Sequence, residues 1–166
     1  MSHSVTITRT TTTTSGSAIL INTGYLKTFP GLLKLAQLIL GAVVVGILAY
    51  YIKRYNYFGT ISSGEIYYFT VAVAFLIGTF CLLLSCLISL STGGIISKTI
   101  YELIYHTIAF LMYLIGAIVF LVEVVNKTSS YSTIYDWHLA AAIIGLIVAC
   151  LYLFSAFLAQ RSYRGI

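Results

Sequence analysis

The third long apolar stretch of the chain holds the residues whose types and spacing could support chemistry. Glu102, His106 and Tyr113 are spaced so that they fall on one face of a helix. A carboxylate beside an imidazole could pass a proton or contribute to a metal site. Two ligands make only half of a metal site, however, and a proton path would need further ionisable groups across a bilayer. For such a path the second and fourth apolar stretches offer only hydroxyls, thiols and His138 at one edge.

A structural role for Glu102 is therefore the interpretation that we favour. Gln37, in the first apolar stretch, lies at a similar depth from the same side of the membrane. The carboxylate of Glu102 could accept hydrogen bonds from Gln37, His106 or the flexible Lys98, which would form a polar clamp between helices made of Gln37, Glu102 and His106. On this interpretation Glu102→Gln is mild because the amide still forms hydrogen bonds, whereas Glu102→Leu is damaging.

Two further side chains are candidates for covalent modification. Cys86 lies toward the end of the second apolar stretch and is a candidate for palmitoylation, although a small buried thiol is the simpler interpretation for it and for Cys81 and Cys150. Asn126 begins an Asn-Lys-Thr glycosylation sequence, which we expect to stay mostly unused because it lies at the membrane end of the third stretch. No nucleophile in the sequence has a base at a suitable spacing. We therefore expect no enzymatic activity, no cofactor and no small-molecule substrate.

Four long runs without Asp, Glu, Lys or Arg are the elements that must position these side chains. They extend over residues 35–52, 66–97, 103–122 and 137–160. About 20 apolar residues suffice for a helix to cross a bilayer, where lipid offers the backbone no hydrogen bonds. With 60% hydrophobic residues, 8% charged residues and a mean hydropathy of +1.00, the composition excludes a soluble domain. We predict an all-α integral membrane four-helix bundle of up-down-up-down topology, with spans at about 32–52, 67–90, 99–122 and 137–160.

The positions of the basic residues predict the orientation of the chain, because cytoplasmic flanks carry an excess of Lys and Arg. Six of the nine bases fall on one side of the spans, and these are Arg9, Lys27, Lys34, Lys98, Arg161 and Arg164. The other side holds Lys53, Arg54 and Lys127. Both termini are therefore expected in the cytoplasm. The net charge of +5 is then concentrated at the inner leaflet, which implies anionic lipids as partners and does not imply nucleic acid.

The rest of the chain divides simply. Residues 1–24 form a Thr-rich tail that we expect to be disordered and cytoplasmic, residues 25–162 form the four-span domain, and residues 163–166 form a cytoplasmic stub. Small residues recur every four positions on three of the spans, a pattern typical of close helix packing in membranes. They are Ala42 with Gly46, Ala74 with Gly78, and Ala141 with Gly145 and Ala149. We expect these faces to pack inside the bundle, with a homo-oligomer seam as the alternative.

Three stretches of the sequence are similar to one known family of four-span proteins. The segment of residues 24–37, GYLKTFPGLLKLAQ, leads into the first span, and the segment of residues 102–113, ELIYHTIAFLMY, opens the third. With the fourth span, Ala140 to Arg161, they resemble MARVEL-domain proteins, especially the chemokine-like-factor MARVEL transmembrane subfamily and its relatives in the MAL and plasmolipin group. The resemblance covers about residues 24 to 162. The family usually has Asn where this chain has His106.

The resemblance implies a four-span bundle with both ends in the cytoplasm and roles in membrane apposition, lipid-domain organisation and vesicle traffic. It implies no catalytic residues. We therefore expect a non-catalytic membrane organiser or trafficking adaptor of the plasma membrane or of vesicles, whose partners are membrane lipids and other membrane proteins. Two alternatives stay open. The first is a cell-junction or cell-fusion component that acts through its exoplasmic loops, and the second is a small ion or solute conductor.

Overall fold

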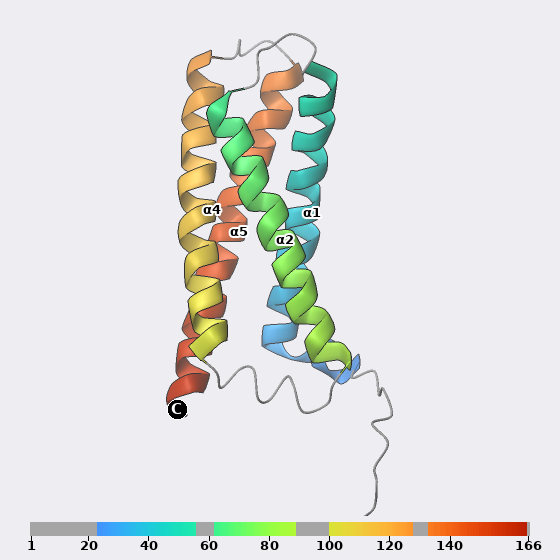
Figure 1. The fold of residues 1–166 in the computed structure, drawn as a ribbon, viewed down its shortest axis with the longest axis vertical. Helices are drawn as coiled ribbons and strands as arrows, with labels where there is room; N and C mark the ends of the chain where they lie inside the picture. The colour runs from blue at the N-terminus through green and yellow to red at the C-terminus, as the bar shows by residue number, and fades with distance from the viewer. Residues whose placement is uncertain (1–22, 56–61, 89–99, 128–132, 166) are drawn as a thin grey trace, which may run out of the picture.

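The fold is a bundle of four long helices preceded by a short one. The computed structural model describes residues 23–55, 62–88, 100–127 and 133–165, and Figure 1 shows their arrangement. The elements are the 3-10 helix η1 (Thr23–Lys27) and the α-helices α1 (Phe29–Tyr55), α2 (Ser63–Ile88), α4 (Ile100–Lys127) and α5 (Thr133–Arg164). All four α-helices are long and apolar enough to cross a membrane. The prediction of an all-α chain with four spanning helices is confirmed for the described residues.

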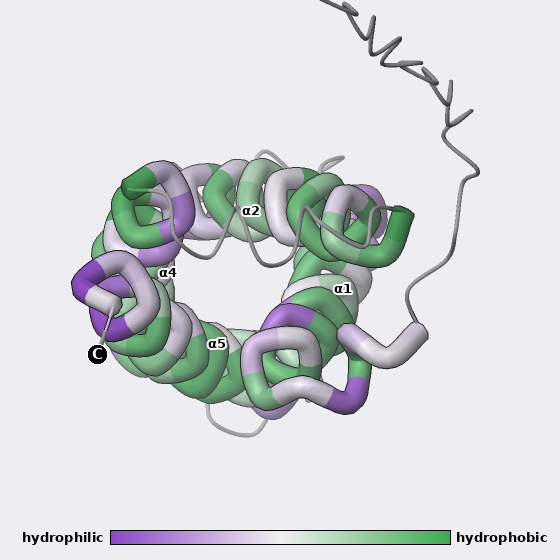
Figure 2. Tube along the Cα trace, turned by 90° about the horizontal axis from the view of Figure 1, so that it is seen from below, coloured by the Kyte–Doolittle hydropathy of each residue, from purple (hydrophilic) through white to green (hydrophobic). Residues whose placement is uncertain are grey.

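The four α-helices form a ring in the order α1, α2, α4 and α5, which Figure 2 shows end-on. Each helix packs against its two neighbours in this ring, and the contact between α4 and α5 is the most extensive. Consecutive helices run in opposite directions, so the first turns of α1 and α4 lie at the same end as the last turns of α2 and α5 (Figure 1). Two pairs therefore face each other across the diagonals of the ring: α1 with α4, and α2 with α5.

Local sequence signals mark where several helices begin and end. The Thr28 hydroxyl accepts a hydrogen bond from the Gly31 backbone amide at 3.2 Å, which caps the start of α1. The Ser62 hydroxyl accepts one from the Glu65 amide at 3.1 Å at the start of α2, where Ser and Glu stand at the spacing of a capping box. Helix α5 ends at Arg164 and is followed by Gly165, whose φ of 71° favours a residue without a Cβ atom.

Aromatic side chains fill the middle of the bundle. Tyr68, Tyr113, Tyr152 and Phe120 are all buried and belong to one continuous core. Tyr68 stacks on Phe120 with ring centroids 5.3 Å apart, and Tyr113 lies 5.5 Å from Tyr152. Such pairs contribute about 0.5–1.5 kcal/mol each beyond the area that they bury. Aromatic side chains therefore fill the interior between the two ends of the described bundle.

Two of these tyrosines also join α2 to α5 across a diagonal of the ring. Tyr68 donates a hydrogen bond to the Ala141 carbonyl at 2.9 Å, and the Tyr152 and Thr79 hydroxyls lie 2.6 Å apart. A Cβ atom on Gly145 would lie 1.8 Å from Tyr68 Oη. Glycine at this position is therefore what lets the tyrosine hydroxyl reach the backbone of α5.

The small-residue face of α5 lies inside the bundle. Ala141, Gly145 and Ala149 are all buried, and the large tyrosine of α2 occupies the space that they leave. Gly78 on α2 has a similar role, because a Cβ atom there would lie 2.6 Å from Tyr105 Oη. At these positions small residues allow aromatic side chains from other helices to approach closely.

The remaining small residues lie on the outer surface, which corrects the expectation that they pack inside the bundle. Ala42, Gly46 and Ala74 are exposed, and no atom lies within 4 Å of a Cβ atom built on Gly46. On α1 the inward positions are instead taken by Val44 and Leu48, both fully buried. A spacing of four residues identifies one face of a helix but does not determine whether that face turns inward. Packing of this surface against another chain stays a prediction.

We predict that Gly145→Ala destabilises the bundle whereas Gly46→Ala does not. The new methyl group on residue 145 would collide with a buried tyrosine, and such overpacking costs about 1–3 kcal/mol of unfolding free energy. Gly46 is the matched control on the exposed face of α1. Unfolding midpoints in mild detergent measure both effects, and adding Tyr68→Phe to Gly145→Ala should recover part of the loss. Equal midpoints for the two single variants would show that Tyr68 does not lie against Gly145.

Candidate functional site

A buried ion pair crosses the bundle near the start of α1. Lys34 Nζ donates a hydrogen bond to Glu102 Oε1, and the two residues are only 2% and 5% exposed. The pair joins α1 to α4, which face each other across a diagonal of the ring. His106, one turn after Glu102, is fully buried and places Nε2 3.5 Å from the same carboxylate oxygen.

Gln37 lies one turn further along α1 and contacts α5. Its side-chain amide donates a hydrogen bond to Ser155 Oγ at 2.8 Å. Among the residues that the structure describes, Gln37 Oε1 and both ring nitrogens of His106 have no hydrogen-bond partner. We call Lys34, Gln37, Glu102, His106 and Ser155 the Lys34 cluster. It connects three of the four long helices at one end of the bundle.

The three residues of the predicted clamp thus lie close to one end of the bundle, but the recorded partner of Gln37 is Ser155 and that of Glu102 is Lys34. Sequence reasoning placed Lys34 among the basic flanks and did not include it. The signal that could have identified it is its spacing of one turn from Gln37 on the same helix. Lys98, the other base considered for Glu102, lies outside the described residues.

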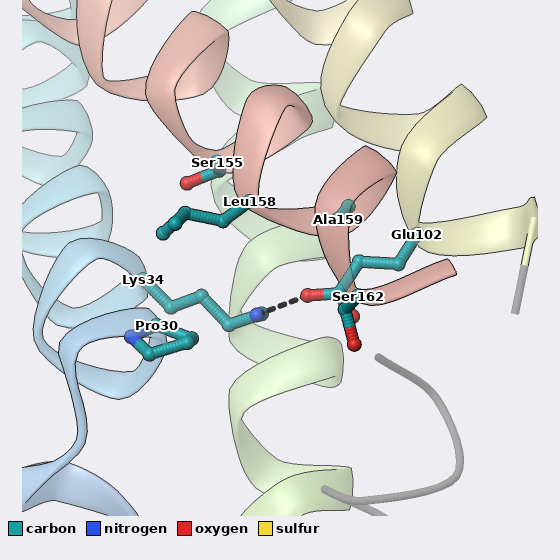
Figure 3. A pocket seen from close by; sticks show the side chains of 7 residues that line it. All are labelled: Pro30, Lys34, Glu102, Ser155, Leu158, Ala159 and Ser162. Atoms are coloured by element: carbon teal, nitrogen blue, oxygen red, sulfur yellow. Dashed lines mark hydrogen bonds and ion pairs between the residues drawn. The ribbon is translucent and has the colours of Figure 1, made fainter. Parts of the chain in front are cut away.

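A partly enclosed cavity of about 120 Å³ adjoins this cluster and is drawn in Figure 3. In that view the Lys34 side chain extends from α1 between Pro30 and Leu158 and reaches Glu102, with Ser162 beside the carboxylate. The lining residues come from α1, α4 and α5, and they are Pro30, Lys34, Glu102, Ser155, Leu158, Ala159 and Ser162. The cavity therefore combines an ion pair and two hydroxyls with apolar walls.

The two candidate modification sites differ in accessibility. Cys86 is a free thiol that is only 1% exposed, so an acyl group could reach it only if the local packing opened. The Cys86 thiol lies beside Tyr25 of η1, and burial together with this thiol raises the pKa of the Tyr25 hydroxyl above its usual value. Asn126 is exposed in the last turn of α4, and the Thr of its glycosylation sequence lies outside the described residues. Modification of Cys86 or Asn126 stays a prediction.

A second polar cluster lies at the opposite end of the bundle. Ser62 donates a hydrogen bond to Glu123 Oε2, and His138 Nε2 lies 3.6 Å from Glu65 Oε1. The His138 ring makes an edge contact with Tyr51, with centroids 5.0 Å apart. We call Ser62, Glu65, Glu123 and His138 the Glu65 cluster. Sequence reasoning named only His138 among these residues, although the cluster links α2, α4 and α5.

The chemistry of both clusters is that of interhelical contacts. Within the described ranges, no group of three or more His, Cys, Asp or Glu side chains is arranged to hold a metal ion. Charged and polar groups buried in a membrane helix bundle need partners inside the protein, because lipid supplies none. The ion pair and the glutamine–serine hydrogen bond meet this need between different helices.

These features define a four-span helical membrane protein. The family model of MARVEL, described as a membrane-associating domain, matches residues 25–158, and the chain belongs to this family. No curated protein and no solved structure matches the chain. The family assignment agrees with the observed helices, since the matched region begins at Tyr25 in η1 and ends in α5.

The ion pair changes the expectation for Glu102→Gln. Because Lys34 is buried, an amide at position 102 would leave the ammonium without a counter-charge, and breaking a buried pair costs about 3–5 kcal/mol of unfolding free energy. We therefore predict a marked loss of stability for Glu102→Gln. Lys34→Met combined with Glu102→Leu removes both charges. This double variant should be clearly more stable than Lys34→Met alone or Glu102→Leu alone. A mild effect of Glu102→Gln in a detergent unfolding assay would contradict a charged pair.

Proposed function

We propose that this chain is a non-catalytic membrane organiser or trafficking adaptor that acts by binding other membrane proteins and lipids. The observation that carries the proposal is the contrast between its interior and its surface. The buried polar side chains are mostly paired with one another, whereas large apolar side chains are exposed along the helices, among them Ile77, Val125, Phe154 and Phe157. Such a surface suits contact with lipid tails and with the helices of partners.

The packing of the interior argues against the conductor alternative. A path for ions needs a water-filled passage along its length. Between the Lys34 cluster and the Glu65 cluster, the described interior holds Tyr68, Tyr113 and Phe120, which are at most 2% exposed. The junction alternative would depend on the loops at residues 56–61 and 128–132, and both lie outside the described residues.

We further propose that both termini lie in the cytoplasm. The start of α1 and the end of α5 lie at the same end of the bundle (Figure 1), and Lys27, Arg161 and Arg164 gather there. Lys34 lies at this end too but is paired with Glu102. The excess of bases supports a cytoplasmic location of this end.

The finer assignment to the chemokine-like-factor subfamily or to its MAL and plasmolipin relatives rests on the resemblance of residues 24–37, residues 102–113 and the fourth span. A location in the plasma membrane or in vesicles would follow from it. Partner choice would then depend on the exposed apolar surface, which can bind helices of other membrane proteins or a second copy of this chain.

The first test of the proposal is association in cells. Purification of the tagged full chain in mild detergent should recover at least one other membrane protein, and loss of the chain should change the surface level or clustering of that protein. An unrelated four-span protein, expressed at the same level with the same tag, is the control. A chain that co-purifies with nothing and supports ion flux in pure liposomes would contradict the proposal.

The second test is topology. Tags at either terminus should be hidden from antibody in intact cells and become accessible after permeabilisation, because the basic end is expected in the cytoplasm. A tag inserted within residues 128–132 is the matched control and should be stained without permeabilisation. Surface staining of an N-terminal tag in intact cells would overturn the orientation.

A further inference from the structure

The cavity beside the Lys34 cluster lies at the depth of lipid headgroups. Pro30 is the second residue of α1, and Ser162 lies two residues before the end of α5. Both helices are membrane spans, so their terminal turns reach the interfacial region where the headgroups of the bilayer lie. The part of a lipid that can occupy this cavity is therefore its polar headgroup.

The lining of the cavity offers charges of both signs. Within the described part of the chain, Glu102 Oε1 is the oxygen that contacts Lys34 and His106, and no contact is recorded for Glu102 Oε2. The Lys34 ammonium has three N–H donors, and its recorded hydrogen bond uses one of them. Ser162 adds a hydroxyl beside the carboxylate, as Figure 3 shows. A group of a single charge would be attracted by one member of the pair and repelled by the other, whereas a zwitterion can satisfy both.

The carboxylate and the walls of the cavity restrict the zwitterion further. The Glu102 carboxylate suits a primary ammonium on a short methylene chain better than a trimethylammonium, because the trimethylammonium has no N–H donor. Pro30, Leu158 and Ala159 provide apolar walls for the methylene groups.

We infer that this cavity binds the headgroup of phosphatidylethanolamine. The ammonium of the lipid donates hydrogen bonds to the Glu102 carboxylate, and its phosphate accepts them from Lys34 and from the Ser162 hydroxyl. Hydrogen bonds between charged groups are stronger than those between neutral groups, and they make the cavity selective for this headgroup. The inference deepens the proposed function by naming a lipid partner, and it rests on that proposal only in placing the chain in a bilayer.

Lipid binding to the purified full-length chain tests this directly. Binding is measured by native mass spectrometry and by the shift of the unfolding midpoint, with phosphatidylethanolamine and phosphatidylcholine of identical acyl chains. Phosphatidylethanolamine should bind about tenfold more tightly, because its ammonium can donate hydrogen bonds to Glu102 and the trimethylammonium of phosphatidylcholine cannot. Phosphatidic acid, an anion without an ammonium, should bind more weakly than phosphatidylethanolamine.

A pair of serine variants separates the cavity from the general surface. Ser162→Leu fills the cavity beside Glu102 without removing either charge and should abolish the preference for phosphatidylethanolamine at an unchanged midpoint in phosphatidylcholine. Ser85→Leu is the matched control, because Ser85 is exposed on α2 and does not line the cavity. Equal binding of the two lipids, tighter binding of phosphatidic acid, or a preference that survives Ser162→Leu would overturn the inference. None of these results would affect the co-purification test of the proposed function.

Discussion

The contact on which the rest of the bundle depends is a buried ammonium that faces a buried carboxylate across the ring of helices. Removing two charges from water costs several kcal/mol per ion, and only a close, well-oriented partner offsets this cost. Lys34 of α1 and Glu102 of α4 provide that partner for each other, and both are almost fully buried. Because neither charge can be left alone in lipid, the pair fixes the depth and rotation of α1 against α4. Helix α5 is then attached to α1 through Gln37 and Ser155.

The second diagonal is held by tyrosines, which fill the centre of the bundle. Tyr68 and Tyr152 reach from α2 and α5 into the centre and form hydrogen bonds there, so the middle of the bundle is filled. At the far end, Glu65 and His138 close the space between α2 and α5. A bundle whose middle is filled in this way leaves its exposed apolar side chains as the surface for the association with lipids and membrane proteins that we propose.

The sequence predicted the number and kind of elements well, because composition and run length are properties of single segments. Four charge-free runs were enough to predict four spanning helices and an all-α chain. Helical spacing also placed Glu102 and His106 correctly on one face. It could not predict the partners on other helices, since Lys34 is distant from Glu102 in sequence, Gln37 is distant from Ser155, and each pair meets only in the assembled ring. For the same reason, the spacing of Ala42 and Gly46 identified a face of α1 but not its outward direction.

Reversing the charges of the pair tests most directly whether it holds the bundle together. Lys34→Glu would place two carboxylates in contact and Glu102→Lys two ammonium groups, so each single variant should fail to reach its membrane in folded form. The combined variant restores an opposite pair in the same place and should recover folded protein, measured as monodisperse material after detergent extraction. Singly reversed chains that fold as well as the wild type, or a combined variant no better than either, would contradict the account.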